Sequence, residues 1–139
     1  MKIRDCIALM IMVFLFGIVA LVGYWLLYPY KPVTINRTPA LVVNKEVDRG
    51  GHLHYLIDFC KNSNITPIVS RTFVDGLVYT PAPYPAPKNE IGCQVLKVAV
   101  YVPKALPSGE YVLETTYTYQ VNPIRHVEVT YSTEPFMVK

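Results

Sequence analysis

Residues 6–27 read Cys-Ile-Ala-Leu-Met-Ile-Met-Val-Phe-Leu-Phe-Gly-Ile-Val-Ala-Leu-Val-Gly-Tyr-Trp-Leu-Leu, and no charged side chain interrupts this run. At about 1.5 Å per residue, a helix of this length extends roughly 33 Å, which is enough to cross the hydrocarbon core of a bilayer. Four aromatic residues gather at its end, where amphipathic rings favour the headgroup region: Tyr24, Trp25, Tyr28 and Tyr30. Because Pro29 cannot continue a helix, the run predicts one transmembrane helix over residues 6–28.

A cleaved signal peptide is the alternative interpretation of the same run. Its charged start would be residues 1–5, and Ile18-Val19-Ala20 is a tolerable cleavage site. No Ala-x-Ala motif follows the apolar run, and hydrophobicity continues beyond any cut, so the sequence favours an uncleaved anchor.

The orientation of this anchor is inferred from the layout of the N-terminus rather than from charge. Lys2 and Arg4 precede the run, but Lys31, Arg37 and Lys45 follow it, so positive charge does not favour a cytoplasmic N-terminus. A short tail followed directly by an apolar run is typical of a signal-anchor, and long domains cross the membrane largely regardless of charge. We therefore expect residues 1–5 in the cytoplasm and the C-terminal domain outside it.

Composition limits what lies beyond the anchor. The chain has 139 residues, so the remainder has the size of one ordinary domain with a core of its own. The net charge is +3, and no block of basic residues marks a nucleic-acid-binding face. Residues 29–39 contain three prolines and predict a short, extended stalk, which leaves residues 40–139 for the domain.

Alternating apolar and polar residues predict the strands of this domain. The expected strands cover residues 40–43, 52–60, 68–73, 77–79, 94–102, 110–121, 127–133 and 136–138. Three of them have a clear apolar face: Leu53, Tyr55, Ile57 and Phe59; Leu96, Val98, Val100 and Val102; and Tyr111, Leu113, Tyr117, Tyr119 and Val121. Short strands with closely spaced turn signals are typical of a β-sandwich.

One motif makes the fold class more specific. Leu106-x-x-Gly109-Glu110-Tyr111 resembles the corner before strand F of immunoglobulin-like domains, where a tyrosine hydroxyl bonds to upstream backbone. Antibody domains have a cysteine where this chain has Leu113, and Trp25 is the only tryptophan, so the usual inter-sheet disulfide and core tryptophan are not expected. The sequence predicts an all-β fold class, with an N-terminal single transmembrane α-helix followed by one immunoglobulin-like antiparallel β-sandwich.

Cys60 and Cys93 are the strongest pair of candidate functional residues. In the expected strand order, Cys60 ends strand B and Cys93 begins strand E, which are antiparallel neighbours in this fold. Both fall on the outward face, so we expect a surface disulfide between strands, worth roughly 3–4 kcal/mol in the chain-entropy model. The alternative is two unrelated thiols in a reducing compartment. Cys6, inside the anchor, is expected to be inert.

The sequence contains no recognisable catalytic set. Serines are few, no glycine-rich loop is suited to phosphate, and the carboxylates are scattered. His52 and His54 share one face of a strand with Asp58, but three firm metal ligands are not visible. We therefore expect no enzyme activity, no metal, no cofactor and no small-molecule substrate.

A proline-rich stretch is the candidate binding element. Every second residue from Pro81 to Pro87 lacks a backbone donor, which predicts an exposed polyproline II segment outside the ladders. Such a segment loses little entropy on binding, so its residues are candidate contacts: Pro81, Pro83, Tyr84, Pro85 and Pro87. The alternative is a spacer between strands C and E.

Several short motifs resemble those of small single-pass membrane proteins encoded by tailed bacteriophages. They are Arg71-Thr72-Phe73-Val74-Asp75-Gly76, Gly92-Cys93, Leu106-Pro107-Ser108-Gly109-Glu110-Tyr111, Val121-Asn122-Pro123-Ile124-Arg125 and Thr133-Glu134-Pro135-Phe136. The resemblance implies a bacterial inner membrane with the domain in the periplasm. It implies no catalytic or binding role for any residue.

These observations predict a membrane-anchored binding module whose partners are the lipid bilayer and an unknown envelope protein. The module would present loops or a sheet edge to that protein. The alternative is a structural subunit of an envelope-spanning complex.

Overall fold

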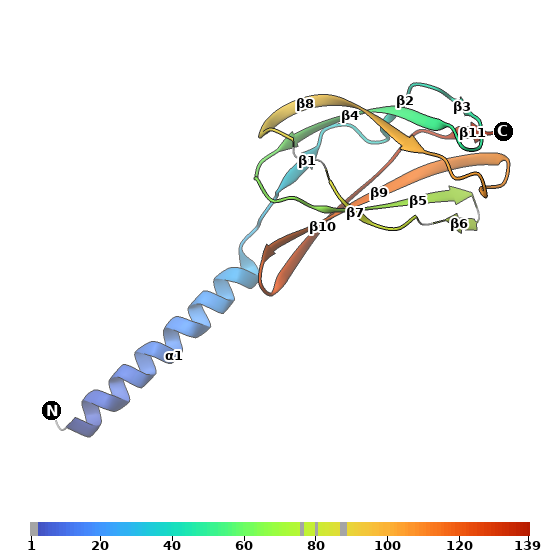
Figure 1. The fold of residues 1–139 in the computed structure, drawn as a ribbon. Helices are drawn as coiled ribbons and strands as arrows, with labels where there is room; N and C mark the ends of the chain where they lie inside the picture. Colours follow the sequence, from blue (N-terminus) through green and yellow to red (C-terminus); the bar gives the residue numbers. More distant parts are fainter. Residues whose placement is uncertain (1–2, 76, 80, 87–88) are drawn as a thin grey trace.

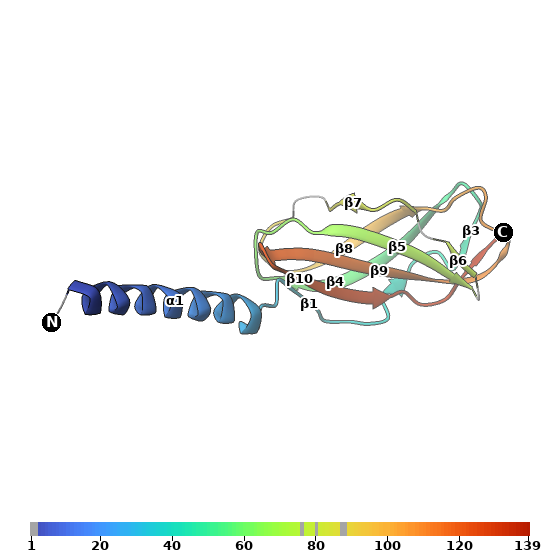
Figure 2. The ribbon, with the colours of Figure 1, turned by 90° about the horizontal axis from the view of Figure 1, so that it is seen from below.

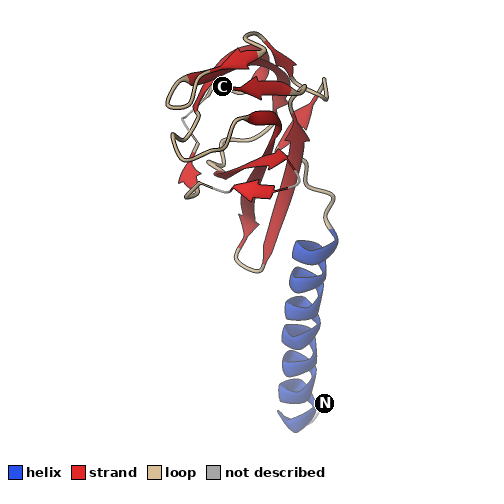
Figure 3. Cartoon of the chain, turned by 90° about the vertical axis from the view of Figure 1, so that its right-hand side faces the viewer, coloured by secondary structure: helices blue, strands red, loops and turns tan. Residues whose placement is uncertain are grey.

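The computed structural model describes residues 3–75, 77–79, 81–86 and 89–139, and it contains one long helix followed by a β-domain (Figure 1). Helix α1 covers Ile3–Leu27, so it begins three residues earlier than the expected position 6. None of its residues is buried, and it is long and apolar enough to cross a bilayer. Figure 3 shows that the helix extends away from one end of the domain.

The strands of the domain form two sheets, which Figure 1 shows as two layers. The first sheet contains β1 (Val33–Ile35), β2 (Leu41–Val42), β4 (His52–Lys61) and β8 (Gly92–Tyr101). The second contains β3 (Glu46–Val47), β5 (Ile68–Asp75), β6 (Leu77–Tyr79), β7 (Tyr84–Pro85), β9 (Gly109–Asn122), β10 (Arg125–Ser132) and β11 (Phe136–Val138).

Each sheet is built around one long central strand. In the first sheet, β4 pairs antiparallel with β8 along its whole length, and β1 and β2 share its other edge. In the second, β9 pairs antiparallel with β5 on one edge and with β10 and β11 on the other, while β3 runs parallel to β11. Figure 2, the view from below, shows β5 and β9 in front of β4 and β8.

The core lies between the two sheets and confirms the expected apolar faces. Its buried side chains include Leu53, Tyr55, Ile57, Phe59, Val100, Val102, Tyr111, Leu113 and Tyr119 from the expected set. Leu96, Val98, Tyr117 and Val121 pack against this core and are partly buried. Phe73 of β5 meets Phe136 of β11 edge to face, with ring centroids 6.4 Å apart. Alternation alone therefore identified which side of each long strand faces inward.

The expected stalk over residues 29–39 is wrong in its second half. Val33–Ile35 form β1, which pairs with Phe59–Lys61 of β4, and Pro32 and Val33 are buried. The Val-Thr-Ile triplet suits a sheet edge better than a solvated spacer, because β-branched side chains pack well on a pleated surface. The folded domain thus begins seven residues before position 40, and only a few residues separate it from α1.

The expected corner contributes packing rather than a hydrogen bond. Leu106 and Tyr111 are almost completely buried in the core. Among the hydrogen bonds of the described residues, none joins the Tyr111 hydroxyl to upstream backbone. Gly109 has a steric reason to be glycine, because a Cβ atom there would lie 2.8 Å from an Asp75 carboxylate oxygen.

Candidate functional site

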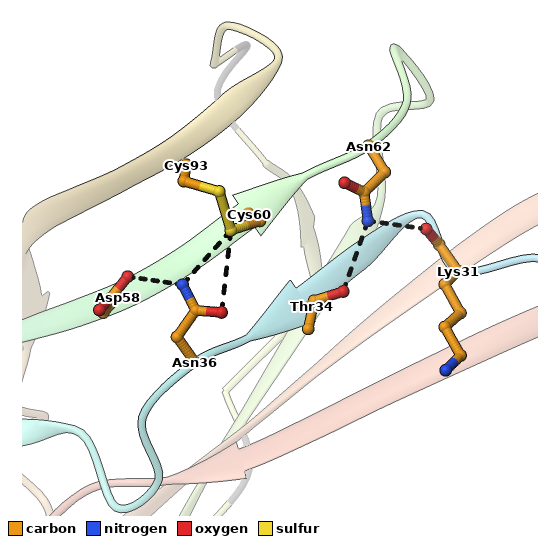
Figure 4. The surroundings of a disulfide bond; sticks show 7 residues. All are labelled: Lys31, Thr34, Asn36, Asp58, Cys60, Asn62 and Cys93. Atoms are coloured by element: carbon orange, nitrogen blue, oxygen red, sulfur yellow. Dashed lines mark hydrogen bonds between the residues drawn. A yellow bond between two sulfur atoms is a disulfide. The ribbon is translucent and has the colours of Figure 1, made fainter.

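Cys60 and Cys93 lie directly opposite each other on β4 and β8, and their sulfur atoms are bonded. Cys60 is half-buried and Cys93 is exposed, as their outward positions require. The amide of Asn36 donates to an Asp58 carboxylate oxygen at 2.8 Å and contacts Cys60 Sγ at 3.3 Å, as Figure 4 shows. Asn36 follows β1, so these contacts hold the start of the domain against the disulfide.

The proline-rich stretch does not lie outside the ladders as expected. Tyr84 and Pro85 form β7, which pairs with Val69 and Ile68 at the edge of β5, and the Ala86 amide donates to the Pro67 carbonyl at 3.0 Å. In an antiparallel ladder, bonded and non-bonded pairs alternate, so Pro85 occupies a position at which no donor is needed. Proline at every second position is therefore compatible with an edge strand.

The candidate contact residues in this stretch differ in exposure. Pro83 and Tyr84 are exposed, and Pro81 is half-buried. The side chain of Pro85 and the whole of Pro87 lie outside the described part of the chain. The exposed polyproline II segment is thus replaced by a strap, residues 81–86, that runs along β5.

Between the strap, β5 and β8 the two sheets leave a cavity of about 340 Å³. It lies where the sheets are open to solvent, between the β8 side of the first sheet and the β5 side of the second. Its walls are mainly apolar and come from both sheets and the strap: Val33, Ile57, Phe59, Lys61, Pro67, Val69, Arg71, Tyr84, Ala86, Asn89, Leu96, Lys97, Val98, Ala99, Tyr117 and Tyr119. This volume falls in the range of small ligand pockets.

A second cavity of about 410 Å³ continues along the same opening. It shares Arg71, Tyr84 and Ala99 with the first cavity, and its other walls are Pro81, Ala82, Val100, Tyr101 and Pro103. We call the two cavities together the β5–β8 groove. Arg71 and Tyr84 lie at its middle, where the guanidinium carbon is 5.2 Å from the centroid of the tyrosine ring.

The charges in the β5–β8 groove are all positive. Lys61, Arg71 and Lys97 line it, and its described lining residues include no aspartate or glutamate. Lys61 donates to the Asn89 carbonyl oxygen at 2.6 Å. The Nε atom of Arg71 is buried and has no hydrogen-bond partner among the described residues. Because three cations line the groove and no described carboxylate neutralises them there, the groove is suited to an acidic group near Arg71.

Three tyrosine hydroxyls form a chain beneath the groove. The Tyr131 oxygen lies 3.0 Å from that of Tyr55 and 3.4 Å from that of Tyr117. Burial, followed by the neighbouring hydroxyls, raises the pKa of Tyr131, and burial is also the main cause that raises the pKa of Tyr117 and Tyr119. The hydroxyls of Tyr117 and Tyr131 therefore stay protonated at neutral pH and act as hydrogen-bonding groups of the core.

The β9–β10 hairpin contacts the end of α1. Asn122 Nδ2 donates to the Trp25 carbonyl at 2.9 Å, and Arg125 Nη1 donates to the carbonyls of Leu26 and Tyr28. A cavity of about 280 Å³ at this junction is lined by Tyr24, Trp25, Tyr28, Tyr30, Val121, Asn122 and Arg125. The interfacial aromatic residues predicted from the sequence therefore meet the domain directly.

Sequence reasoning did not single out Arg71, Lys97 or the free side of β8. The alternation of apolar and polar residues identified the inward face of each strand, but no local signal showed that β5 and β8 would leave a gap between them.

The histidines considered as metal ligands make other contacts. His52 packs edge to face on Tyr101 with ring centroids 5.8 Å apart. Within the described ranges, no group of three His, Cys, Asp or Glu residues is placed to hold a metal ion.

The chain matches no protein-family model and no curated protein.

Proposed function

We propose that this chain is a membrane-anchored, non-catalytic binding module with an immunoglobulin-like sandwich. The pairing pattern supports the fold assignment, because β4 with β8 corresponds to strands B and E, and β9 with β5 and β10 corresponds to F with C and G. In an immunoglobulin-like fold, strands B and E belong to one sheet and strands C, F and G belong to the other, and the same division separates β4 and β8 from β5, β9 and β10. Cys60 and Cys93 then occupy the end of B and the start of E.

Anchoring is supported by the surface of α1. The helix has no buried residue, so its apolar side chains form a patch far larger than water-soluble monomers expose. A bilayer is the simplest environment for such a helix. The disulfide supports placing the domain outside the cytoplasm, because such bonds persist in oxidising compartments. The motif resemblance to phage-encoded proteins makes the bacterial inner membrane the proposed location.

The observation that carries the binding function is the composition of the β5–β8 groove. Its described lining residues are apolar, aromatic, amide or cationic, and none is a histidine, cysteine, serine or carboxylate. Most acid–base and nucleophilic catalysis uses such groups. Lysine and tyrosine can also serve, but no hydrogen bond of the described residues joins a lysine of the groove to one of its tyrosines. The groove is therefore built to hold a partner rather than to transform it.

The proposal is tested by fractionation and topology. The protein should stay in the membrane fraction after carbonate extraction, and alkaline phosphatase fused after Lys139 should be active. A mature N-terminus near Leu21, found by mass spectrometry, would replace the anchor by a cleaved signal peptide. An inactive phosphatase fusion beside an active cytoplasmic reporter would invert the orientation.

A further inference from the structure

Strand β8 has a long edge that no described strand covers. One edge pairs with β4 over ten residues, and no other described strand pairs with β8. It reads Gly-Cys-Gln-Val-Leu-Lys-Val-Ala-Val-Tyr, which contains no proline and one charge, Lys97. Val95 and Tyr101 are 63% and 49% exposed on it. A long apolar edge is a template for another strand unless proline, charge or a bulge protects it.

The other edges of the molecule are short or protected. The second sheet ends in β6 and in β7, which has only two residues, one of them proline. At its opposite margin lie β3, also two residues long, and β10, whose eight residues carry the charged side chains of Arg125 and Glu128. The free margin of the first sheet is divided between β1 and β2. Within the described strands, β8 therefore stands out as the edge that combines length with little protection.

The free backbone groups of this edge can be assigned by alternation. The Val102 amide donates to the Gly51 carbonyl at 2.9 Å, and the register from Gly92 to Tyr101 is unbroken, so Val98 and Val100 also point their amides at β4. The amides of Lys97, Ala99 and Tyr101 then point away from it. An independent contact agrees: the His54 carbonyl, opposite Ala99, accepts from Val43 of the neighbouring segment instead.

The β5–β8 groove lies beside these free groups. A strand added to β8 would direct alternate side chains into the groove, where the walls include Val69, Leu96 and Val98. Leu96 and Val98 face the core but are only partly buried, because no described strand on the free side of β8 covers them. At the middle of the groove, Arg71 contributes a guanidinium that stacks on Tyr84 and has no carboxylate among the described lining residues.

Charge identifies the kind of partner. The described lining carries three cations and no carboxylate, so an acidic segment complements it. A second copy of this chain does not, because its β8 would bring a second Lys97 to the same edge, and like charges across a ladder are destabilising. We infer that β8 binds an extended, acidic segment of a partner protein as an added strand, with apolar side chains in the groove and a carboxylate beside Arg71. This inference rests on the proposed binding function.

The test uses the full chain in lipid nanodiscs and the fluorescent peptide Val-Thr-Val-Thr-Glu-Thr-Val-Thr-Val, read by fluorescence polarisation. Its odd positions would enter the groove and place glutamate beside Arg71. Two matched peptides separate the contributions: one has lysine in place of glutamate, and one is N-methylated on the amides that would face β8. Each should bind at least about tenfold more weakly, because a charge-assisted contact or the ladder bonds are lost.

Protein variants test the same edge from the other side. Arg71→Gln should weaken binding of the glutamate peptide about tenfold, whereas Arg37→Gln, which changes an exposed arginine outside the groove, should not. Ala99→Pro removes an edge-facing amide and should abolish binding, whereas Ala99→Ser keeps the amide and should bind normally. If Ala99→Pro does not fold, the N-methylated peptide still decides the question on the wild-type protein.

Equal binding of the N-methylated peptide, or of the lysine peptide, would overturn the inference. So would a wild-type dimer that Ala99→Pro dissociates, which would assign the edge to a second copy. Envelope partners captured equally by wild type and by a folded Ala99→Pro variant would overturn strand addition and leave the proposed binding function in place. Failure of the proposed function is visible separately, in carbonate extraction and in the phosphatase fusion.

Discussion

Arg125 donates a hydrogen bond to the backbone carbonyl oxygen of Tyr28, which lies at the end of helix α1. The same Nη1 atom lies 3.1 Å from the carbonyl of Leu26. The last carbonyls of a helix have no partner within it and form the negative end of its dipole, so a guanidinium stabilises them twice, by hydrogen bonding and by charge. The β9–β10 hairpin therefore caps the helix and fixes the domain to it, although the two are far apart in sequence.

Removing this cap should loosen the junction without unfolding the domain. Arg125→Ala deletes both contacts, and because they are exposed to solvent the expected loss of stability is about 1 kcal/mol or less. Trp25 is the only tryptophan and lines the junction, so its fluorescence reports the change directly. In nanodiscs, Arg125→Ala should make Trp25 more accessible to acrylamide and lower its anisotropy, while Arg37→Ala should not. Unchanged quenching would show that the hairpin does not hold the helix.

The buried tyrosines predict a loss of stability at alkaline pH. Burial raises the pKa of Tyr117, Tyr119 and Tyr131 in the folded domain, whereas unfolded tyrosines ionise near a pKa of about 10. Their contribution is therefore complete below about pH 10 and decreases as the pH rises further, because only the unfolded chain releases the protons. The part of the tyrosinate absorbance that comes from these three side chains should appear together with the loss of the circular dichroism signal above pH 10. Tyr131→Phe should make the decline shallower, and ionisation of all tyrosines in a still folded domain would contradict this account.

The disulfide should stabilise the domain without being required for its fold. Cys60→Ser opens a bond between residues 33 positions apart, which the chain-entropy model values at roughly 3–4 kcal/mol. The core residues of β4 and β9 remain buried without it, so a cooperative but lower melting transition is expected. Cys6→Ser is the matched control and should melt like the wild type, because Cys6 is free. If Cys93 of the wild type reacts with alkylating reagents in intact, unreduced cells, either the bond does not form or the orientation is inverted, and the phosphatase fusion after Lys139 distinguishes the two.

Local pattern predicted most of the fold because it acts within one strand. The apolar faces at Leu53–Phe59 and Tyr111–Val121 follow from a period of two, which survives any tertiary context that buries one face. The cysteine positions could be paired because facing and strand order agreed. Val33–Ile35 was missed because its neighbouring prolines outweighed three β-formers, and its partner lies in β4, more than twenty residues away.

The groove could not be predicted because it depends on what is missing between distant strands. Arg71 looks like any half-exposed strand arginine until Tyr84 and Ala99 are brought beside it. The proline-rich strap was misjudged for a different reason. The prediction treated every proline as the loss of a ladder hydrogen bond. Only alternate residues of a strand point their amides at a given neighbouring strand, so a proline at one of the other positions removes no bond.

The alternation of bonded and non-bonded positions along the strap can be tested with a matched pair of substitutions. Ala86→Pro removes the amide that donates to Pro67, so it should detach the strap from β5 and cost about 1 kcal/mol or more. Pro85→Ala restores a donor at a position that faces away from β5 and should leave the pairing intact. Amide hydrogen exchange at Tyr84 reports the pairing, because its register partner is Val69. Exchange at Tyr84 should accelerate in Ala86→Pro and remain slow in Pro85→Ala. Equal exchange in both variants would mean that the strap is held by side-chain packing, such as Arg71 on Tyr84, and not by its ladder bonds.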